Sequence, residues 1–168
     1  REDKIKVIYP YSAMLNAVAS GKQLYFKTEH HWTDDGAYVG YKELMEVINK
    51  DYPNIKVLDS QDFNYKHSRM VRGDFTRKFN YGDNCRFIGI SNALCSTYHQ
   101  YEYTYYQHKD FNNVGKIVID VPFHRNKIYH YNKGYNARVI LLGTSQGGAL
   151  TEFIPYTFKD VKRIRNNT

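Results

Sequence analysis

The fold is decided first by the stretch Phe26-Lys27-Thr28-Glu29-His30-His31-Trp32-Thr33-Asp34-Asp35-Gly36-Ala37. It places a carboxylate, two imidazoles and the only tryptophan at a predicted strand-to-helix junction. Side chains alternate between the faces of a strand, so a strand over residues 24–31 would put Glu29 and His31 on one face and His30 on the other. Residues two apart on a strand have Cβ atoms about 6–7 Å apart. The Glu29 carboxylate is therefore expected to reach the His31 imidazole if the strand end bends.

The helix after this junction is predicted over residues 34–50. Thr33 suits the N-cap position, and Asp34 and Asp35 place negative charge in the first turn, where the helix dipole favours it. Apolar side chains then recur at helical spacing, at Ala37, Tyr41, Leu44, Met45 and Ile48. Pro53 is expected to end the helix.

A second stretch, far downstream, offers a candidate nucleophile: Val139-Ile140-Leu141-Leu142-Gly143-Thr144-Ser145-Gln146-Gly147-Gly148. Its apolar part predicts a strand over 138–142 of the kind that parallel sheets bury on both faces. Small residues around Ser145 permit a tight turn, and a following helix would offer backbone N–H groups to an oxyanion. Such a turn also binds phosphate or has no chemical role, so the turn alone does not identify a nucleophile.

The remaining elements are expected to alternate along the chain. Helices are predicted at 12–20 and after residue 148, and strands at 4–9, 54–60, 86–107, 116–121 and 161–164. Residues 61–81 are expected to be mainly loop with a short helix near 74–80, and 124–136 a loop or a hairpin turning at 132–134. This order predicts one domain over 1–168, an α/β fold built as a three-layer α/β/α sandwich with a mostly parallel sheet.

Composition is consistent with a globular chain, since 42% of residues are hydrophobic and 24% are charged. The 17 tyrosines suit a surface that contacts sugars, although half-buried strands also use tyrosine. A net charge of +7 favours anionic partners, but no basic helix or recognised motif supports nucleic acid as a partner.

Several residues are of the types that bind metals or form disulfides. Glu29, His30 and His31 are ligand types, yet neighbouring histidines on a strand diverge and no further ligands follow at a recognisable spacing, so neither a metal nor a cofactor is expected. Cys85 and Cys95 leave two alternatives open, a disulfide in an oxidising compartment or free thiols. The chain has no initiator Met, so we expect its natural N-terminus, with any signal or anchor, to have been removed.

The motifs carry a family resemblance. Glu29-His30-His31-Trp32-Thr33, followed by Gly36-Ala37, resembles the signature of the DHHW proteins and the related alginate O-acetyltransferase proteins, in which Asp-x-His-Trp precedes Thr and then Gly-Ala. Leu141-Leu142-Gly143-Thr144-Ser145 is similar to their later Gly-Asp-Ser or Gly-Thr-Ser block. Val71-Arg72-Gly73-Asp74-Phe75 resembles their Gly-Asp-Leu block more loosely.

Such proteins have an SGNH-hydrolase-like domain with circularly permuted blocks, so that the acid and base precede the serine. The resemblance implies that Ser145 is the nucleophile, His31 the general base and Glu29 the group that orients His31. It also implies that oxyanion or substrate contacts come from Gln146, Gly73, Asp74 and Trp32. Glu29 departs from the family Asp, and its extra methylene lengthens the reach by about 1.5 Å. Family domains usually extend further, so the domain is expected to be truncated at both ends.

The function implied by this resemblance is serine-dependent O-acetyl transfer to an extracellular polysaccharide, or removal of acetyl esters from it. The acetyl group would come from a membrane-bound O-acyltransferase partner, and the protein would act outside the cytoplasm. The departure at Glu29 and the tyrosine-rich strands leave a second interpretation, a non-catalytic carbohydrate-binding or polysaccharide-assembly protein on the same scaffold.

Overall fold

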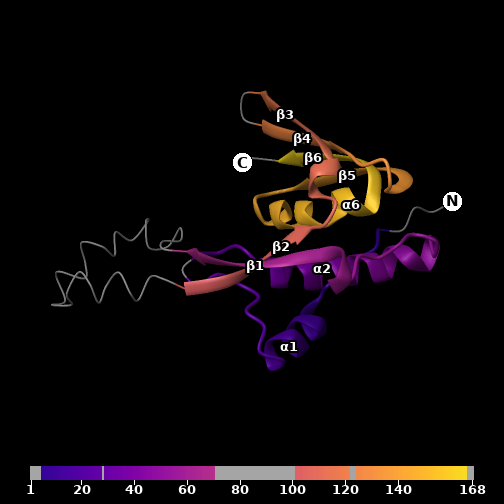
Figure 1. Ribbon diagram of the computed structural model, residues 1–168. Coiled ribbons are helices and arrows are strands. Elements are labelled where there is room, and N and C mark those ends of the chain that lie inside the picture. Colours follow the sequence, from indigo (N-terminus) through magenta and orange to yellow (C-terminus); the bar gives the residue numbers. More distant parts are fainter. Residues whose placement is uncertain (1–4, 28, 71–100, 122–123, 166–168) are drawn as a thin grey trace.

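The computed structural model describes residues 5–27, 29–70, 101–121 and 124–165, and it contains two sheets with helices packed beside them (Figure 1). The helices are α1 (Tyr11–Ala19), α2 (Asp34–Asp51) and α6 (Ile154–Thr157), with 3-10 turns η1 (Ser60–Asp62), η2 (Phe111–Asn113) and η3 (Gln146–Glu152). Strands β1 (Phe63–Met70) and β2 (Tyr101–His108) form an antiparallel pair. Strands β3 (Gly115–Val121), β4 (His124–His130), β5 (Tyr135–Gly143) and β6 (Phe158–Arg165) form the second sheet.

The four-stranded sheet is mixed, with the order β3-β4-β6-β5. The pairs β3/β4 and β4/β6 are antiparallel, and only β5/β6 is parallel. Figure 1 shows η3 and α6 between this sheet and α2, with α1 on the far side of α2. Within the described ranges, the helices thus lie on one side of the sheet, and the prediction of a mostly parallel sheet is not confirmed.

Strand β5 differs from its prediction in burial. It lies at one edge of the sheet, and Ile140 and Leu142 are 64% and 70% exposed. The continuous apolar run indicates a strand covered on both faces, but its alternate side chains face the side that the described helices do not cover. The prediction of burial on both faces is therefore wrong for this strand.

Most other elements agree with the sequence patterns. Helix α2 begins after Thr33, whose side chain accepts a hydrogen bond from Gly36 N, and α1, β3 and β6 lie where helices and strands were expected. Residues 5–9 and 54–59 are not strands, although Ile55 and Leu58 are buried. The loop predicted for 61–81 contains β1, and the helix near 74–80 lies outside the described residues.

Two connections also differ from their predictions. The turn at 132–134 exists, but it does not close a hairpin, because β6 lies between β4 and β5 in the sheet. The helix expected after Ser145 is divided into η3 and α6, with Pro155 in the first turn of α6. A proline is tolerated there because the first turn needs no donor from it.

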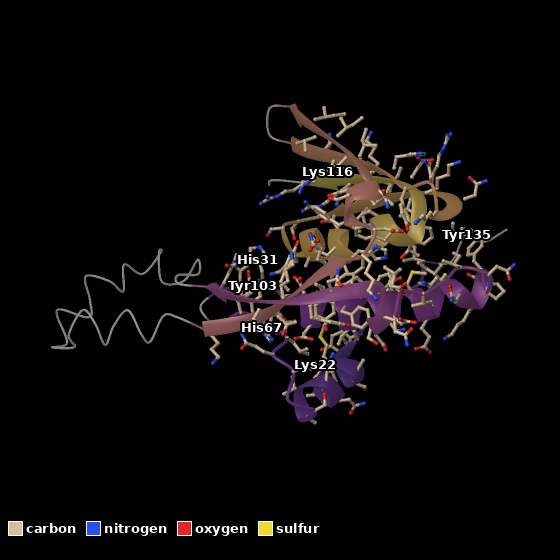
Figure 2. The ribbon with its side chains drawn as sticks, viewed as in Figure 1. Lys22, His31, His67, Tyr103, Lys116 and Tyr135 are labelled. Carbon is tan, nitrogen blue, oxygen red and sulfur yellow. The ribbon has the colours of Figure 1, made fainter. Side chains whose placement is uncertain are left out.

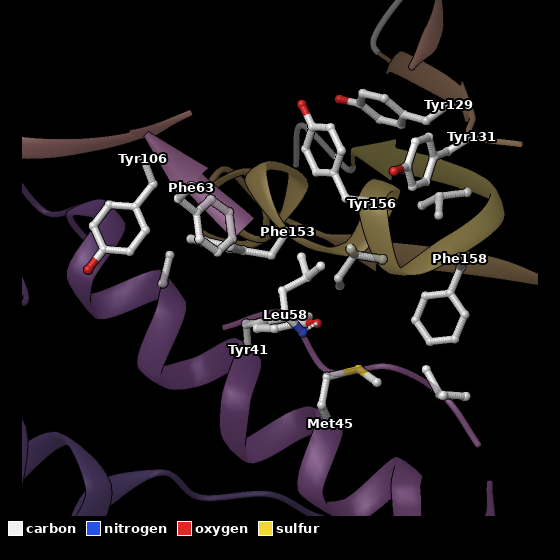
Figure 3. Packing of buried hydrophobic residues seen from close by; sticks show 14 residues of the cluster. Tyr41, Met45, Leu58, Phe63, Tyr106, Tyr129, Tyr131, Phe153, Tyr156 and Phe158 are labelled. Atoms are coloured by element: carbon white, nitrogen blue, oxygen red, sulfur yellow. Dashed lines mark hydrogen bonds between the residues drawn. The ribbon is translucent and has the colours of Figure 1, made fainter. Parts of the chain in front are cut away.

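The core is built largely from aromatic rings between α2 and the segment that follows β5 (Figure 3). Tyr41 and Phe153 are fully buried and stack with ring centroids 5.4 Å apart. The Tyr41 hydroxyl lies 2.8 Å from Thr157 Oγ1 and accepts a hydrogen bond from Leu58 N at 3.0 Å. One hydroxyl therefore joins α2, α6 and the segment before β1.

Replacing Tyr41 by Phe should lower the free energy of unfolding by about 1–3 kcal/mol, because the buried Leu58 N–H loses its acceptor. Urea denaturation measures this change. Tyr52→Phe is the matched control, since Tyr52 is 56% exposed at the end of α2. Equal unfolding free energies for the two variants would contradict the role assigned to the Tyr41 hydroxyl.

Candidate active site

The segment before α2 is a closed loop rather than the predicted strand. Thr33 N donates to Leu24 O at 3.0 Å and Phe26 N donates to His31 O at 3.2 Å, while Tyr25 and Trp32 form an isolated antiparallel bridge. A Cβ atom on Gly36 would lie 2.2 Å from Leu24 O, so a residue without a side chain is required for α2 to pack against the loop. The loop is thereby fixed to the start of α2.

Glu29 and His31 face each other within this loop. The Glu29 carboxylate contacts His31 Nδ1, and both side chains are mostly buried (Figure 2 labels His31). The pair was predicted from its spacing, and the bend of the loop brings the two groups together. His30 is exposed, but the prediction that its ring diverges from His31 is wrong, because the two ring centroids lie 3.9 Å apart.

Ser145 occupies the turn between β5 and η3. Its backbone is helical, with φ −58° and ψ −33°, and its carbonyl accepts from Gly148 N at 2.8 Å. The Ser145 hydroxyl does not cap η3. The serine is therefore presented at the end of a strand, directly before a helical turn.

A hydrogen bond connects this turn to the Glu29–His31 loop. Gln146 Nε2 donates to His30 O at 2.6 Å, across 116 positions of sequence. The two stretches singled out from the sequence are thus adjacent in space. Gln146 Oε1 is buried and has no hydrogen-bond partner among the described residues.

Arg163 supports the serine turn from β6. Its side chain is only 6% exposed, and its Nη2 donates to Thr144 O at 3.4 Å. A Cβ atom on Gly148 would lie 2.9 Å from the same nitrogen, so the guanidinium fills the space beside the first turn of η3. The sequence did not identify Arg163, because a charged residue in a strand is normally taken as solvent-exposed.

The other predicted contact residues do not complete the site in the described part of the chain. The Trp32 ring packs on Gly40 and lines an apolar groove of about 730 Å³ that α1 and Tyr25 also border. Gly73 and Asp74 lie outside the described residues, as do Cys85 and Cys95. The roles proposed for these residues stay predictions.

Asp34 is a buried acid that the sequence assigned only to the helix dipole. Its carboxylate accepts from Tyr106 N at 2.8 Å, and the neighbouring Asp35 accepts from Tyr106 OH at 2.7 Å. Burial raises the pKa of Asp34 from 3.8 to about 6, against the lowering effect of the Tyr106 N–H. These bonds attach the start of α2 to β2.

Neither a metal cluster nor a membrane span is found among the described residues. They include no group of three or more His, Cys, Asp or Glu side chains arranged to hold a metal ion. No described helix is both long enough and apolar enough to cross a membrane.

Comparison with known families identifies the scaffold. The family of the SGNH hydrolase-like domain of the acetyltransferase AlgX matches residues 1–110. The chain belongs to this family. The match includes Glu29 and His31 and ends before Ser145.

Solved structures extend the likeness over most of the chain. A DHHW family protein from Eubacterium siraeum superposes with a TM-score of 0.66 over 93% of this chain and 55% of its own, at 13% identity. Bacillus cereus PatB1 superposes with a TM-score of 0.57 over 84% and 53%, at 18% identity. The chain spans about half the length of these structures. Both matches support the SGNH-hydrolase-like fold, and no curated protein matches the chain.

Asp34→Asn should flatten the pH dependence of stability. Folding favours the neutral form of the Asp34 carboxyl. Its stabilising contribution to the folded state is therefore fully present below about pH 4 and is lost as the pH rises through about 6. Between pH 4 and pH 7.5 the free energy of unfolding of the wild type should fall by about 1–3 kcal/mol relative to that of the variant. The amide oxygen of the variant still accepts from Tyr106 N. Urea unfolding across this range measures the difference, and parallel curves would refute the assignment.

Proposed function

We propose that this chain carries out serine-dependent O-acetyl transfer, with Ser145 as nucleophile, His31 as general base and Glu29 as the residue that orients His31. The hydrogen bond between Gln146 and His30 carries the proposal, because it holds the serine turn against the loop of the Glu29–His31 pair. This contact supports a Ser-His-acid mechanism in which the serine turn supplies the nucleophile and the loop before α2 supplies both the base and the acid.

The mechanism follows from the contact between Glu29 and His31. With Nδ1 directed at Glu29, Nε2 of His31 is the nitrogen that takes the Ser145 proton as the hydroxyl attacks an acetyl ester. Backbone N–H groups at the serine turn, with Gly73 as a further candidate, would hold the oxyanion. His31 then protonates the leaving group, and an acceptor hydroxyl attacks the acetyl-enzyme as His31 removes its proton.

The acceptor in this proposal is a polysaccharide outside the cytoplasm, and a membrane-bound O-acyltransferase supplies the acetyl group. The family name supports acetyl transfer. The non-catalytic alternative rested partly on Glu29, yet the longer side chain reaches His31. Hydrolysis replaces transfer whenever water reaches the acetyl-enzyme before a sugar hydroxyl does.

Ser145→Ala and His31→Ala should each abolish turnover of p-nitrophenyl acetate by the purified chain, and intact mass should show one added acetyl group on the wild type only. One structure of B. cereus PatB1 carries a sulfonyl adduct. Sulfonyl fluorides react with activated serine hydroxyls, so phenylmethylsulfonyl fluoride should also label the wild type and not Ser145→Ala. Equal rates in all three proteins would refute the proposed function.

The identity of residue 29 should control the rate through His31. Glu29→Gln keeps the size of the side chain but removes the charge that stabilises the imidazolium, so kcat should fall roughly 10²- to 10⁴-fold. Glu29→Asp restores the family residue and should retain more activity than Glu29→Gln. Steady-state kinetics of the two variants side by side provides the test, and a lower rate for Glu29→Asp would show that the carboxylate charge is not the controlling feature.

A further inference from the structure

A second cavity lies far from the serine turn. It has a volume of about 270 Å³ and is lined from several elements, including His108 at the end of β2, Tyr131 after β4 and Tyr135 at the start of β5. Strand β5 runs from Tyr135 to Gly143, a distance of about 26 Å at the usual rise per residue. Figure 2 accordingly shows Tyr135 on the right of the view and His31 left of its centre.

The lysine and aspartate side chains that line this cavity form ion pairs with one another. Lys133 Nζ donates to Asp110 Oδ2 at 2.8 Å, and Lys56 Nζ donates to Asp62 Oδ1 at 2.6 Å. Burial lowers the pKa of His108, which favours the neutral imidazole. The His108 Nδ1 accepts from Asp110 N at 3.0 Å, so the ring proton of the neutral form resides on Nε2. The lining therefore offers donors and acceptors without a large excess of either charge.

Flat aromatic faces accompany these polar groups. The His108 ring stacks on Tyr156 with centroids 4.1 Å apart and planes 12° apart. Tyr131 lies edge-on to Tyr156 (Figure 3), with ring centroids 5.9 Å apart. The Tyr131 hydroxyl donates to Asp110 Oδ2 at 2.6 Å. Hydrogen bonds thus fix the orientation of Tyr131, while Tyr135 remains partly exposed at the start of β5. A rigid cavity with aromatic walls and a few fixed polar groups is typical of a small-ligand site.

We propose that this cavity binds an uncharged sugar ring of the polysaccharide acceptor. A charged ligand would find no uncompensated opposite charge, and a purely apolar ligand would remove water from the lysine and aspartate groups without replacing its hydrogen bonds. A pyranose has both hydroxyls for these groups and a C–H face for the ring of Tyr135, which is 36% exposed whereas Tyr131 and Tyr156 are buried. Only the identification of this sugar as the acetyl acceptor rests on the proposed function.

A neighbouring cavity lies beside this one. It has a volume of about 290 Å³, and Tyr156 lines both cavities. Glu152, which ends η3, lines the second one, and η3 begins directly after Ser145. Glu152 lies at the opposite end of η3 from Ser145, about 14 Å away at the usual 3-10 rise, so this second cavity extends the sugar site along η3 without reaching the serine turn.

Calorimetric titration of the Ser145→Ala protein tests the proposal without turnover. The probes are hexasaccharides of β-1,4-linked glucose, β-1,4-linked N-acetylglucosamine and α-1,4-linked glucose, with hexa-mannuronate as the charged comparison. At least one neutral hexasaccharide should bind, and Tyr135→Ala and Lys133→Met should each weaken that binding tenfold or more. Both side chains are partly or largely exposed, and unfolding curves will confirm that each variant folds.

Tyr52→Ala is the matched control, because it removes an exposed tyrosine outside the cavity and should leave the affinity unchanged. The proposal is overturned if no neutral hexasaccharide binds, if hexa-mannuronate binds more tightly, or if neither cavity variant changes the affinity. Saccharide binding without esterase turnover in the wild type would leave the sugar site standing and remove the proposed function. Turnover without saccharide binding would leave the proposed function standing and remove the sugar site.

Discussion

The buried hydroxyl of Tyr41 is the constraint on which the arrangement of the site depends. Helix α2 carries the Glu29–His31 loop at its start, and α6 follows directly from the 3-10 turn that begins after Ser145. The bond between Tyr41 and Thr157 fixes α2 against α6 in the middle of the aromatic core. Because close-packed interiors transmit small displacements, the distance between the Glu29–His31 loop and the Ser145 turn is set by this packing as well as by contacts at the site.

Local signals predicted the parts of the fold that local interactions determine. Helix α2 has a cap, a favourable first turn and an apolar stripe, and all three are encoded within its own residues. The Glu29–His31 pair was predicted for a strand and occurs in a loop, because short spacing brings the side chains together in either conformation once the chain bends.

Tertiary context determined what the sequence could not show. The exposure of Ile140 depends on the place of β5 at the sheet edge, which strand order alone decides. Arg163 is buried and Asp34 is partly buried because other segments cover them, and no pattern in their own neighbourhoods indicates it. The high tyrosine content was attributed to a sugar-binding surface or half-buried strands, yet Tyr41 and Tyr106 serve the core.

The separation between the serine turn and the sugar site has a chemical consequence. In the proposed reaction, water would compete with the acceptor for the acetyl-enzyme, and a general base alone would not distinguish one hydroxyl from another. An effective concentration of about 10⁵–10⁸ M applies only to a hydroxyl held in contact with the acetyl group, which a sugar ring bound about 26 Å away does not achieve by itself. Binding in the cavity of His108 and Tyr131 would instead tether the polysaccharide and raise the local concentration of its hydroxyls without any change at Ser145. The cavity lined by tyrosines and ion pairs would then determine which polysaccharide binds. The reaction itself would take place at the serine turn, where Gln146 donates to the His30 carbonyl.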